Sequence, residues 1–226
     1  MEGCDLMAGR MLAIGDIHGC DRALELLLSK LNVVADDTLV VLGDVIDRGP
    51  GSRQVIEQLL VTQTKCRLIF LMGNHEQMLL DALVGGRGAG PWLQYGGDTT
   101  LASYGDDPSA IPASHFEFLK SGLDYWENAT EIFIHANLQP RVPLAEQSAE
   151  WLRWTHLSGN EQPHPSGKRI ICGHTSQKSG IPWTRPGWVD IDTYAHGSGG
   201  WLTGLDVGTN EFIQTNQAGD LRAASL

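Results

Sequence analysis

Short apolar runs alternate with helix-like stretches over the first third of the chain. Three mainly apolar runs predict strands, at residues 11–14, 38–42 and 68–71. In residues 24–31 and 55–60, leucine, valine and isoleucine recur at the spacing of one helix face. We expect Ser52 to be the N-cap of the second of these helices. The order strand, helix, strand, helix, strand, helix is typical of a parallel sheet with crossover helices.

The pattern changes after residue 84. The glycine-rich segment 85–91 predicts a mobile loop, because such a sequence holds neither a helix nor a central strand. Residues 114–121 predict a helix, and short strands are expected at residues 131–135, 169–172, 188–192, 202–207 and 211–215. The later strands lie close together with turn residues between them, so we expect antiparallel neighbours in a second sheet.

The chain as a whole reads as one mixed α/β unit. It has 226 residues, of which 42% are hydrophobic and 19% charged, and no linker divides it. We therefore expect a single domain over residues 1–226. The four cysteines (Cys4, Cys20, Cys66 and Cys172) form no C-x-x-C pair, which predicts buried free thiols.

Charge and hydropathy exclude several classes of partner. No apolar stretch reaches the roughly 20 residues that a membrane helix needs, and the acidic start lacks the order of a signal peptide. We therefore expect a cytoplasmic protein. The net charge of −11 opposes binding to nucleic acid and to anionic membranes. A phosphate-bearing substrate must then be attracted locally, by metal ions or a few arginines.

Polar clusters follow the predicted strands at their carboxyl ends. The first three strands run into Asp16-x-His18, Asp44-x-x-Asp47-Arg48 and Asn74-His75-Glu76, and two later strands end in His135 and Gly173-His174. In an open α/β sheet such ends converge on one crevice. Asp, Asn and His are oxygen and nitrogen ligands that suit divalent metals. Together these residues predict a metal site, with room for two ions.

Two divalent ions also fit the charge of this set. Asp16 and Asp44 supply two negative charges, and the Asn and His ligands are neutral. The occupied site would keep a positive charge that attracts a phosphate dianion. A carboxylate such as that of Asp44 can bridge two ions about 3.5–4 Å apart, the separation used for in-line displacement at phosphorus.

These motifs resemble those of the phosphoprotein phosphatase family of metallophosphoesterases, which has the calcineurin-like fold. The similarity is greatest to the small bacterial and bacteriophage lambda-type serine/threonine protein phosphatases, and it spans residues 10–207. The matching segments are Gly-Asp-Ile-His-Gly at 15–19, Gly-Asp-Val-Ile-Asp-Arg-Gly at 43–49, Gly-Asn-His-Glu at 73–76, Ile-His-Ala at 134–136 and Gly-His-Thr at 173–175. The resemblance implies a sandwich of two mixed β-sheets flanked by helices, with the dimetal site at the carboxyl ends of the strands.

The resemblance also implies a role for each site residue. The first metal would be bound by Asp16, His18 and Asp44, and the second by Asp44, Asn74, His135 and His174. Of the remaining residues, His75 would be the general acid with Asp47 as its carboxylate partner, and Arg48 and Arg153 would bind the phosphate oxygens. The expected cofactors are two divalent ions, Mn²⁺ first, with Fe and Zn²⁺ as alternatives.

The expected reaction is hydrolysis of a phosphomonoester by a metal-bridging hydroxide. The substrates would be phosphoserine or phosphothreonine in proteins or peptides, with small phosphoesters as an alternative. Asp47 and Glu76 favour this over a nucleotide hydrolase related to diadenosine tetraphosphatase, which shares the scaffold. A third interpretation is a phosphoprotein-binding module without turnover. Such a module would be expected to lack a metal ligand or the general acid, and neither is missing from this sequence.

Several residues are assigned to structure rather than chemistry. We expect Glu76 to interact with the dipole of a helix first turn. The histidines outside the motifs are expected on the surface or in packing: His115, His156, His164 and His196. The sequence departs from the family pattern at Ser176 and at residues 194–200, near the metal-binding strand ends, where substrate contacts differ.

Overall fold

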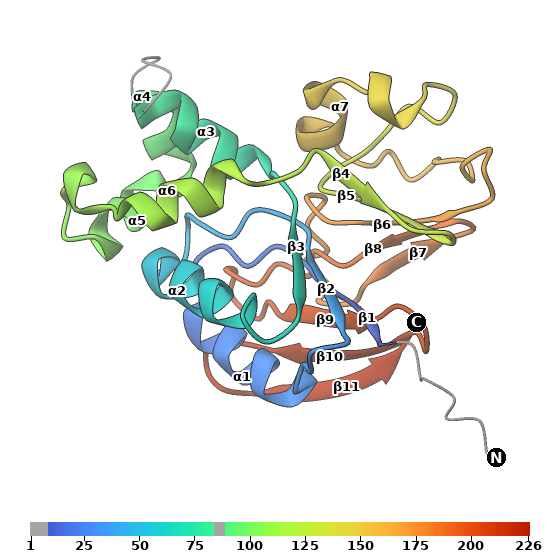
Figure 1. Cartoon of the computed structure of the whole chain (residues 1–226), viewed down its shortest axis with the longest axis horizontal. Coiled ribbons are helices and arrows are strands. Elements are labelled where there is room, and N and C mark those ends of the chain that lie inside the picture. The colour runs from blue at the N-terminus through green and yellow to red at the C-terminus, as the bar shows by residue number, and fades with distance from the viewer. Residues whose placement is uncertain (1–8, 84–88) are drawn as a thin grey trace.

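The protein is built in four layers of helix, sheet, sheet and helix. The computed structural model describes residues 9–83 and 89–226. One sheet has six strands in the order β11-β10-β9-β1-β2-β3, and the other has five in the order β4-β5-β6-β8-β7. Helices α1 and α2 cover the outer face of the first sheet, and α7 lies over the second (Figure 1). The expected sandwich of two mixed sheets flanked by helices is confirmed.

The strands are short and the longer helices lie in the first half. The strands are β1 Met11–Ile14, β2 Thr38–Val41, β3 Arg67–Phe70, β4 Tyr125–Glu127, β5 Glu131–Ile134, β6 Arg169–Cys172, β7 Trp183–Arg185, β8 Trp188–Asp190, β9 Leu202–Asp206, β10 Glu211–Thr215 and β11 Leu221–Ser225. The helices are α1 Asp21–Leu31, α2 Ser52–Thr62, α3 Asn74–Leu83, α4 Gly90–Trp92, α5 Asp98–Ser103, α6 Ala113–Lys120 and α7 Ala149–Trp154. Single turns of other helix types lie at η1 Leu93–Gly97, η2 Pro108–Ala110 and η3 Leu144–Glu146.

Alternate residues of the central strands enter different cores. In β1, Leu12 and Ile14 pack toward the helices, whereas Ala13 packs between the sheets. In β6, Ile171 faces the space between the sheets, and Ile170 and Cys172 pack toward α7. Side chains of a strand point alternately to its two faces, so a strand covered on both sides must be apolar throughout. This explains the continuous apolar runs of the sequence.

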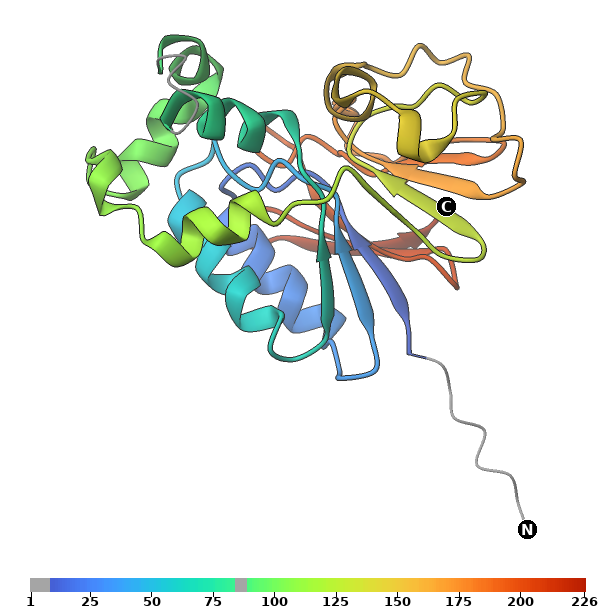
Figure 2. The same ribbon diagram turned by 45° about the horizontal axis from the view of Figure 1, so that its top comes forward.

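The parallel strands bring the polar clusters to one edge. β1 pairs with β2, and β2 with β3, in parallel register. In the second sheet β5, β6 and β8 are also parallel. Both sets of carboxyl ends open at the same side of the molecule, where the loops after β1, β2 and β3 meet those of the second sheet (Figure 2). The site lies at this common edge.

Three sequence expectations are wrong in detail. β9 and β10 are antiparallel neighbours as expected, but they extend the first sheet by pairing with β1. Ser52 is the first residue of α2 and does not cap it; the cap is Gly51, and the Ser52 hydroxyl instead accepts from the N–H of Asp47 (3.0 Å). Of the loop predicted at 85–91, residues 85–88 lie outside the described residues, and Gly90–Trp92 form α4 with Pro91 in its first turn.

Other expectations hold for the part of the chain that is described. Cys20, Cys66 and Cys172 are buried free thiols, and Cys4 lies outside that part. Among helices of residues 9–83 and 89–226, none has the length and apolar character to cross a bilayer.

Before β2, buried Asp37 accepts hydrogen bonds from the guanidinium and backbone of Arg10 and from the N–H of Val34.

Candidate metal centre

Asp44 lies at the centre of the site. It follows β2 in a left-handed conformation (φ 49°) and is 2% exposed. Its carboxylate belongs to two groups of candidate metal ligands, one with His18 and His75 and one with His135 and His174, and the ligand atoms in each group lie within 4.8 Å of one another. A carboxylate shared between two groups is the arrangement that bridges two ions.

Three of the four histidines in these groups have one ring nitrogen tied to a backbone carbonyl. The bonds are His18 Nδ1 to Ile46 O (3.1 Å), His135 Nδ1 to Leu42 O (2.8 Å) and His174 Nε2 to Trp154 O (3.1 Å). A carbonyl only accepts, so these nitrogens carry the proton. The opposite nitrogen of each ring then keeps its lone pair, which is the form that binds metal.

Burial favours the same neutral form of His18 and His174. It lowers the pKa of His174 to about 3, with the nearby charge of His135 acting in the same direction. Burial and the neighbouring His75 also place the pKa of His18 well below its usual value. Metal ligands must be deprotonated, so the protein environment already prepares these side chains for binding.

Two electron-rich atoms meet where the second ion is expected. His135 Nε2 lies 3.1 Å from Asn74 Oδ1. With its Nδ1 proton donated to Leu42, His135 has no proton left for this contact, and an amide oxygen is also an acceptor. A cation bound by both atoms turns this repulsion into attraction. The donor set therefore fits a divalent metal.

Asp16 differs from the expected arrangement. It falls outside both ligand groups, and its carboxylate accepts from the backbone N–H of His174 (3.2 Å to each oxygen). Burial and the nearby charges of Asp192 and Asp44 raise the pKa of Asp16 well above its usual value. Such crowded negative charge is relieved by a bound cation. A Cβ at Gly173 would lie 2.1 Å from Asp16 Oδ1, so the site needs a glycine there.

His75 and Asp47 form a buried pair beside Asp44. His75 Nδ1 donates to Asp47 Oδ2 (2.7 Å), and Asp47 also accepts from the indole N–H of Trp92 (2.9 Å) and the hydroxyl of Thr100 (2.6 Å). Burial disfavours the imidazolium, but the charges of Asp44 and Asp47 outweigh it and raise the pKa of His75. His75 Nε2 has no hydrogen-bond partner among the described residues. Nε2 is therefore the nitrogen of His75 that can contact another molecule.

The two arginines differ in their surroundings. Arg48 has φ 69° and donates from Nη1 to His18 Nε2 (3.2 Å), so its guanidinium lies at the ligand cluster. Arg153 on α7 donates from Nε to Asp124 (3.1 Å) and from Nη1 to Gln77 (3.3 Å). Gln77 follows His75 on α3 by two positions, so Arg153 lies near the first turn of that helix but is already ion-paired.

Two residues make contacts at the site that their sequence positions did not indicate. Glu76 is fully buried and accepts from the backbone N–H groups of Asp44 (2.9 Å), Val45 (2.8 Å) and Gly73 (3.0 Å), so it holds the loop that carries Asp44. The ring of His196 makes an edge contact with that of His18 (centroids 4.7 Å apart). The signal for His196 was the departure from the family pattern at residues 194–200.

Unusual backbone conformations concentrate at this centre. Within the described part of the chain, positive φ angles outside glycine occur at His18, Asp44, Asp47, Arg48, His174 and Tyr194, and elsewhere at Asn32, Asp106 and Asn210. Such conformations cost about 1–3 kcal/mol each and persist where the surrounding structure imposes them. Their gathering here marks a functional site rather than a packing defect.

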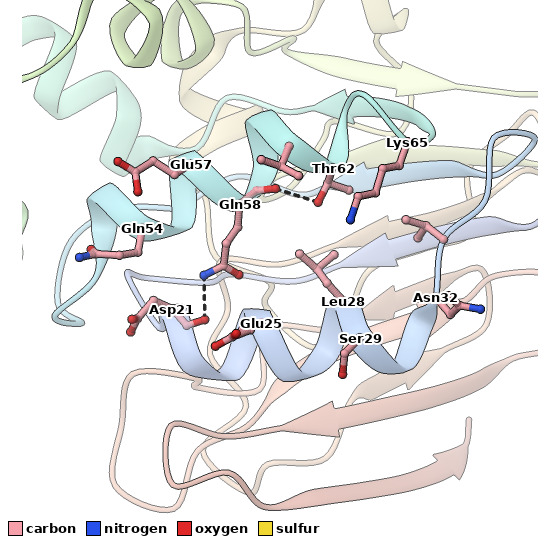
Figure 3. Close-up of a pocket in the computed structure, with 12 residues that line it drawn as sticks. Asp21, Glu25, Leu28, Ser29, Asn32, Gln54, Glu57, Gln58, Thr62 and Lys65 are labelled. Carbon is pink, nitrogen blue, oxygen red and sulfur yellow. Dashed lines mark hydrogen bonds between the residues drawn. The ribbon is translucent and has the colours of Figure 1, made fainter.

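A second concave region lies away from the ligands. A groove of about 700 Å³ runs between α1 and α2, lined by side chains such as Glu25, Gln58 and Thr62 (Figure 3). The side chain of Gln58 bridges to the carbonyl of Asp21 (3.1 Å). None of the candidate ligands lines this groove.

The chain matches known metallophosphoesterases in sequence. A family model described as calcineurin-like phosphoesterase matches residues 9–184. The symmetrical bis(5'-nucleosyl)-tetraphosphatase of Acidovorax ebreus (strain TPSY) is 41% identical over 78 residues, covering 34% of this chain and 27% of that protein. The enzyme of the same name from Janthinobacterium sp. (strain Marseille) is 29% identical over 161 residues, covering 66% of this chain and 56% of that protein.

Solved structures share the fold. A cold-active protein tyrosine phosphatase aligns with 95% of this chain and 78% of its own, with a TM-score of 0.70 and 18% identity. At this identity the likeness shows the fold alone. The alignment to the Janthinobacterium relative spans about half of that protein's length.

Proposed function

We propose, from the premise that this chain belongs to the calcineurin-like phosphoesterase family, that it hydrolyses bis(5'-nucleosyl) polyphosphates. The hydrolytic part of the proposal is carried by one observation. Two groups of ligands share Asp44, and three of their histidines, His18, His135 and His174, have one ring nitrogen each tied to a backbone carbonyl. This arrangement supports a site for two divalent ions.

The ligand set supports a particular assignment of residues to metals. His18, Asp44 and Asp16 would hold one ion, and Asp44 would share the second with three further residues, Asn74, His135 and His174. Bound there, divalent ions would activate water and neutralise charge on the phosphate. We propose Mn²⁺, because the oxygen and nitrogen donors suit it. We also propose that residues 1–226 act as one catalytic domain.

The side chains around the metals supply the rest of the chemistry. His75 donates its Nδ1 proton to Asp47, so its protonated form offers Nε2–H to the oxygen that leaves phosphorus. Asp47 keeps the ring oriented and stabilises its positive charge, since the hydrogen bonds from Trp92 and Thr100 hold the carboxylate in place. The guanidinium of Arg48 lies where it can bind a phosphate oxygen.

The substrate class is supported by the relatives. Both proteins described above are named for hydrolysis of bis(5'-nucleosyl) tetraphosphates, and one is 41% identical over the matched region. This favours the nucleotide reading over the protein phosphatase that Asp47 and Glu76 indicated in the sequence. The match covers 27% of that relative, so the substrate belongs to the proposal and not to the family assignment.

Protein phosphatase activity is the second candidate. It is favoured by the buried His75–Asp47 pair. A serine or threonine alkoxide is a poor leaving group that needs a proton in the transition state, whereas a nucleoside diphosphate leaves more easily. A well-oriented acid is therefore most useful on a phosphomonoester.

A substrate panel separates these functions. The chelated and dialysed protein is supplied with Mn²⁺ and tested on diadenosine tetraphosphate, a phosphoserine peptide and p-nitrophenyl phosphate. We expect the highest kcat/KM on diadenosine tetraphosphate, with two ADP as products. A higher kcat/KM on the peptide would replace this proposal with the second candidate. Binding of phosphopeptide without turnover of any of the three would instead indicate a binding module.

A further inference from the structure

An exposed tryptophan stands beside the metal centre at the end of α7. The backbone carbonyl of Trp154 accepts the ring proton of His174 (3.1 Å), and its indole N–H donates to Gln77 Oε1 (3.1 Å). Gln77 lies on α3, two residues after His75. Trp154 is therefore tied to both walls of the centre, to a candidate metal ligand on one side and to the helix of the candidate acid on the other.

The position of this side chain is well defined, although it is 37% exposed. A surface tryptophan without partners would turn about its side-chain bonds, but the bond to Gln77 fixes the indole plane. The ring of His156 also stacks on that of His174 (centroids 4.4 Å apart, planes at 20°), which restrains the chain that follows α7. The exposed aromatic surface is thus held in place before any ligand arrives.

A guanidinium shares the anchor of the indole. Arg153 donates to the same Gln77 Oε1 (3.3 Å) that accepts from Trp154, and its Nε also donates to Asp124 (3.1 Å). An aromatic surface and a guanidinium that share one anchor match the two chemical parts of a nucleotide, its flat base and its phosphates. Aromatic side chains bind bases by stacking without regard to base identity.

We propose that Trp154 is a stacking surface for one nucleobase of a dinucleoside polyphosphate whose phosphate chain lies over the metal centre. The inference rests on the proposed function, because it names the part of that substrate that this side chain recognises. Trp154 acts in binding and takes no part in the bond that breaks. Its contribution therefore falls on KM and leaves kcat nearly unchanged.

The test compares substrates with and without a base. Wild type, Trp154→Ala and Trp154→Phe are assayed in Mn²⁺ on diadenosine tetraphosphate and on inorganic tetraphosphate, which has the same phosphate chain. Stacking on one base corresponds to about a 5- to 150-fold change in affinity. We expect Trp154→Ala to raise KM for the dinucleotide about 10-fold or more, with kcat and the inorganic substrate unaffected. Trp154→Phe should recover most of the loss.

Binding measurements keep this inference separate from the proposed function. Calorimetry compares ADP with pyrophosphate in wild type and in Trp154→Ala, and Val61→Ala on the exposed face of α2 is the control. We expect Trp154→Ala to abolish the preference of the wild type for ADP. If diadenosine tetraphosphate is not hydrolysed, but wild type binds ADP more tightly than pyrophosphate and Trp154→Ala does not, the proposed function fails and the stacking site stands.

Three results would overturn the stacking site. The first is an unchanged KM for diadenosine tetraphosphate in Trp154→Ala, which leaves the proposed function intact. The second is an equal loss on inorganic tetraphosphate, which would mean that the substitution disturbs the centre itself. The third is a wild type that binds ADP no better than pyrophosphate.

Discussion

Replacing Glu76 by glutamine should weaken both the fold and the metal centre. The carboxylate accepts three buried backbone N–H groups, from Asp44 and Gly73 on one oxygen and from Val45 on the other. A glutamine keeps only one acceptor oxygen. In its better orientation it still accepts from two of these groups, but its NH₂ then faces the third N–H at the former bonding distance.

The expected loss follows from these contacts. An unsatisfied buried donor costs about 1–3 kcal/mol. Burial and the charge of Asp44 raise the pKa of Glu76 to about 8, so the comparison is made at about pH 9, where the two bonds that lose the help of a full charge weaken by about 1 kcal/mol each. Removing a buried negative charge beside Asp44 offsets part of this. We expect Glu76→Gln to lower the free energy of unfolding by about 2–4 kcal/mol, and to lower metal affinity about 10- to 100-fold because the loop carrying Asp44 loosens.

Urea unfolding and calorimetry with Mn²⁺ measure the two effects. The metal-free protein is unfolded first, so that lost metal binding does not contribute to the stability difference. Glu57→Gln is the matched control, since Glu57 lies on the exposed face of α2 and pairs with Arg53 four residues earlier. Its effect should stay within about 0.5 kcal/mol. Equal unfolding midpoints for the two variants would refute the idea that Glu76 supports this loop.

Three further predictions concern single side chains. His75→Asn should keep its metal and lose about 10²–10⁴-fold in rate on a phosphoserine peptide, with a smaller loss on p-nitrophenyl phosphate, whose leaving group needs no proton. Gly173→Ala should lower Mn²⁺ affinity at least ~10-fold in calorimetry, because the new Cβ would lie 2.1 Å from Asp16 Oδ1. Gly90→Ala is the control and should leave Mn²⁺ affinity unchanged, because its Cβ meets nothing within 4 Å. Burial opposes ionisation of Asp37, but its hydrogen bonds outweigh this and lower its pKa, so the stability that Asp37→Asn removes at pH 7 should disappear as pH falls below about 4.

Each of these has a contrary result. Equal loss on both substrates would show that His75 is not the acid, and loss of metal would show that it is a ligand. Unchanged metal affinity in Gly173→Ala would mean that Asp16 moves without cost. For Asp37, a stability difference from Asp37→Asn that stays constant between pH 7 and pH 3 would exclude a depressed pKa in the folded state.

The sequence predicted the parallel strands because their signals are local. Residues 11–14, 38–42 and 68–71 are apolar on both faces, and each ends in a glycine and a polar cluster. The partner of β9 was not predictable in the same way. Closely spaced strands indicate antiparallel pairing with one another, but nothing local states which sheet the pair joins, and β9 adds to β1 across nearly the whole chain.

The candidate site was predictable where side chains form it. His18, His135 and His174 gather with Asp44 because strand ends converge at one sheet edge. Glu76 lies in the first turn of α3 as expected and accepts from Gly73 just before that helix, but its bonds to the N–H groups of Asp44 and Val45 reach a different loop, which the local sequence does not place beside it. His196 lies in a loop whose path depends on the fold of both sheets, so sequence spacing could not place it against His18.

The backbone acceptors of the three histidines have a consequence for how the protein can evolve. The carbonyls of Ile46, Leu42 and Trp154 are present whatever side chain those positions carry. Mutations there can therefore change size, polarity or substrate contacts and still leave every ring in its metal-binding tautomer. The tautomer of His75 depends instead on a side chain, because the acceptor of its Nδ1 proton is the Asp47 carboxylate. A substitution of Asp47 would therefore release the His75 ring from its orientation, whereas substitutions of Ile46, Leu42 or Trp154 leave the carbonyl that orients each metal-binding ring in place.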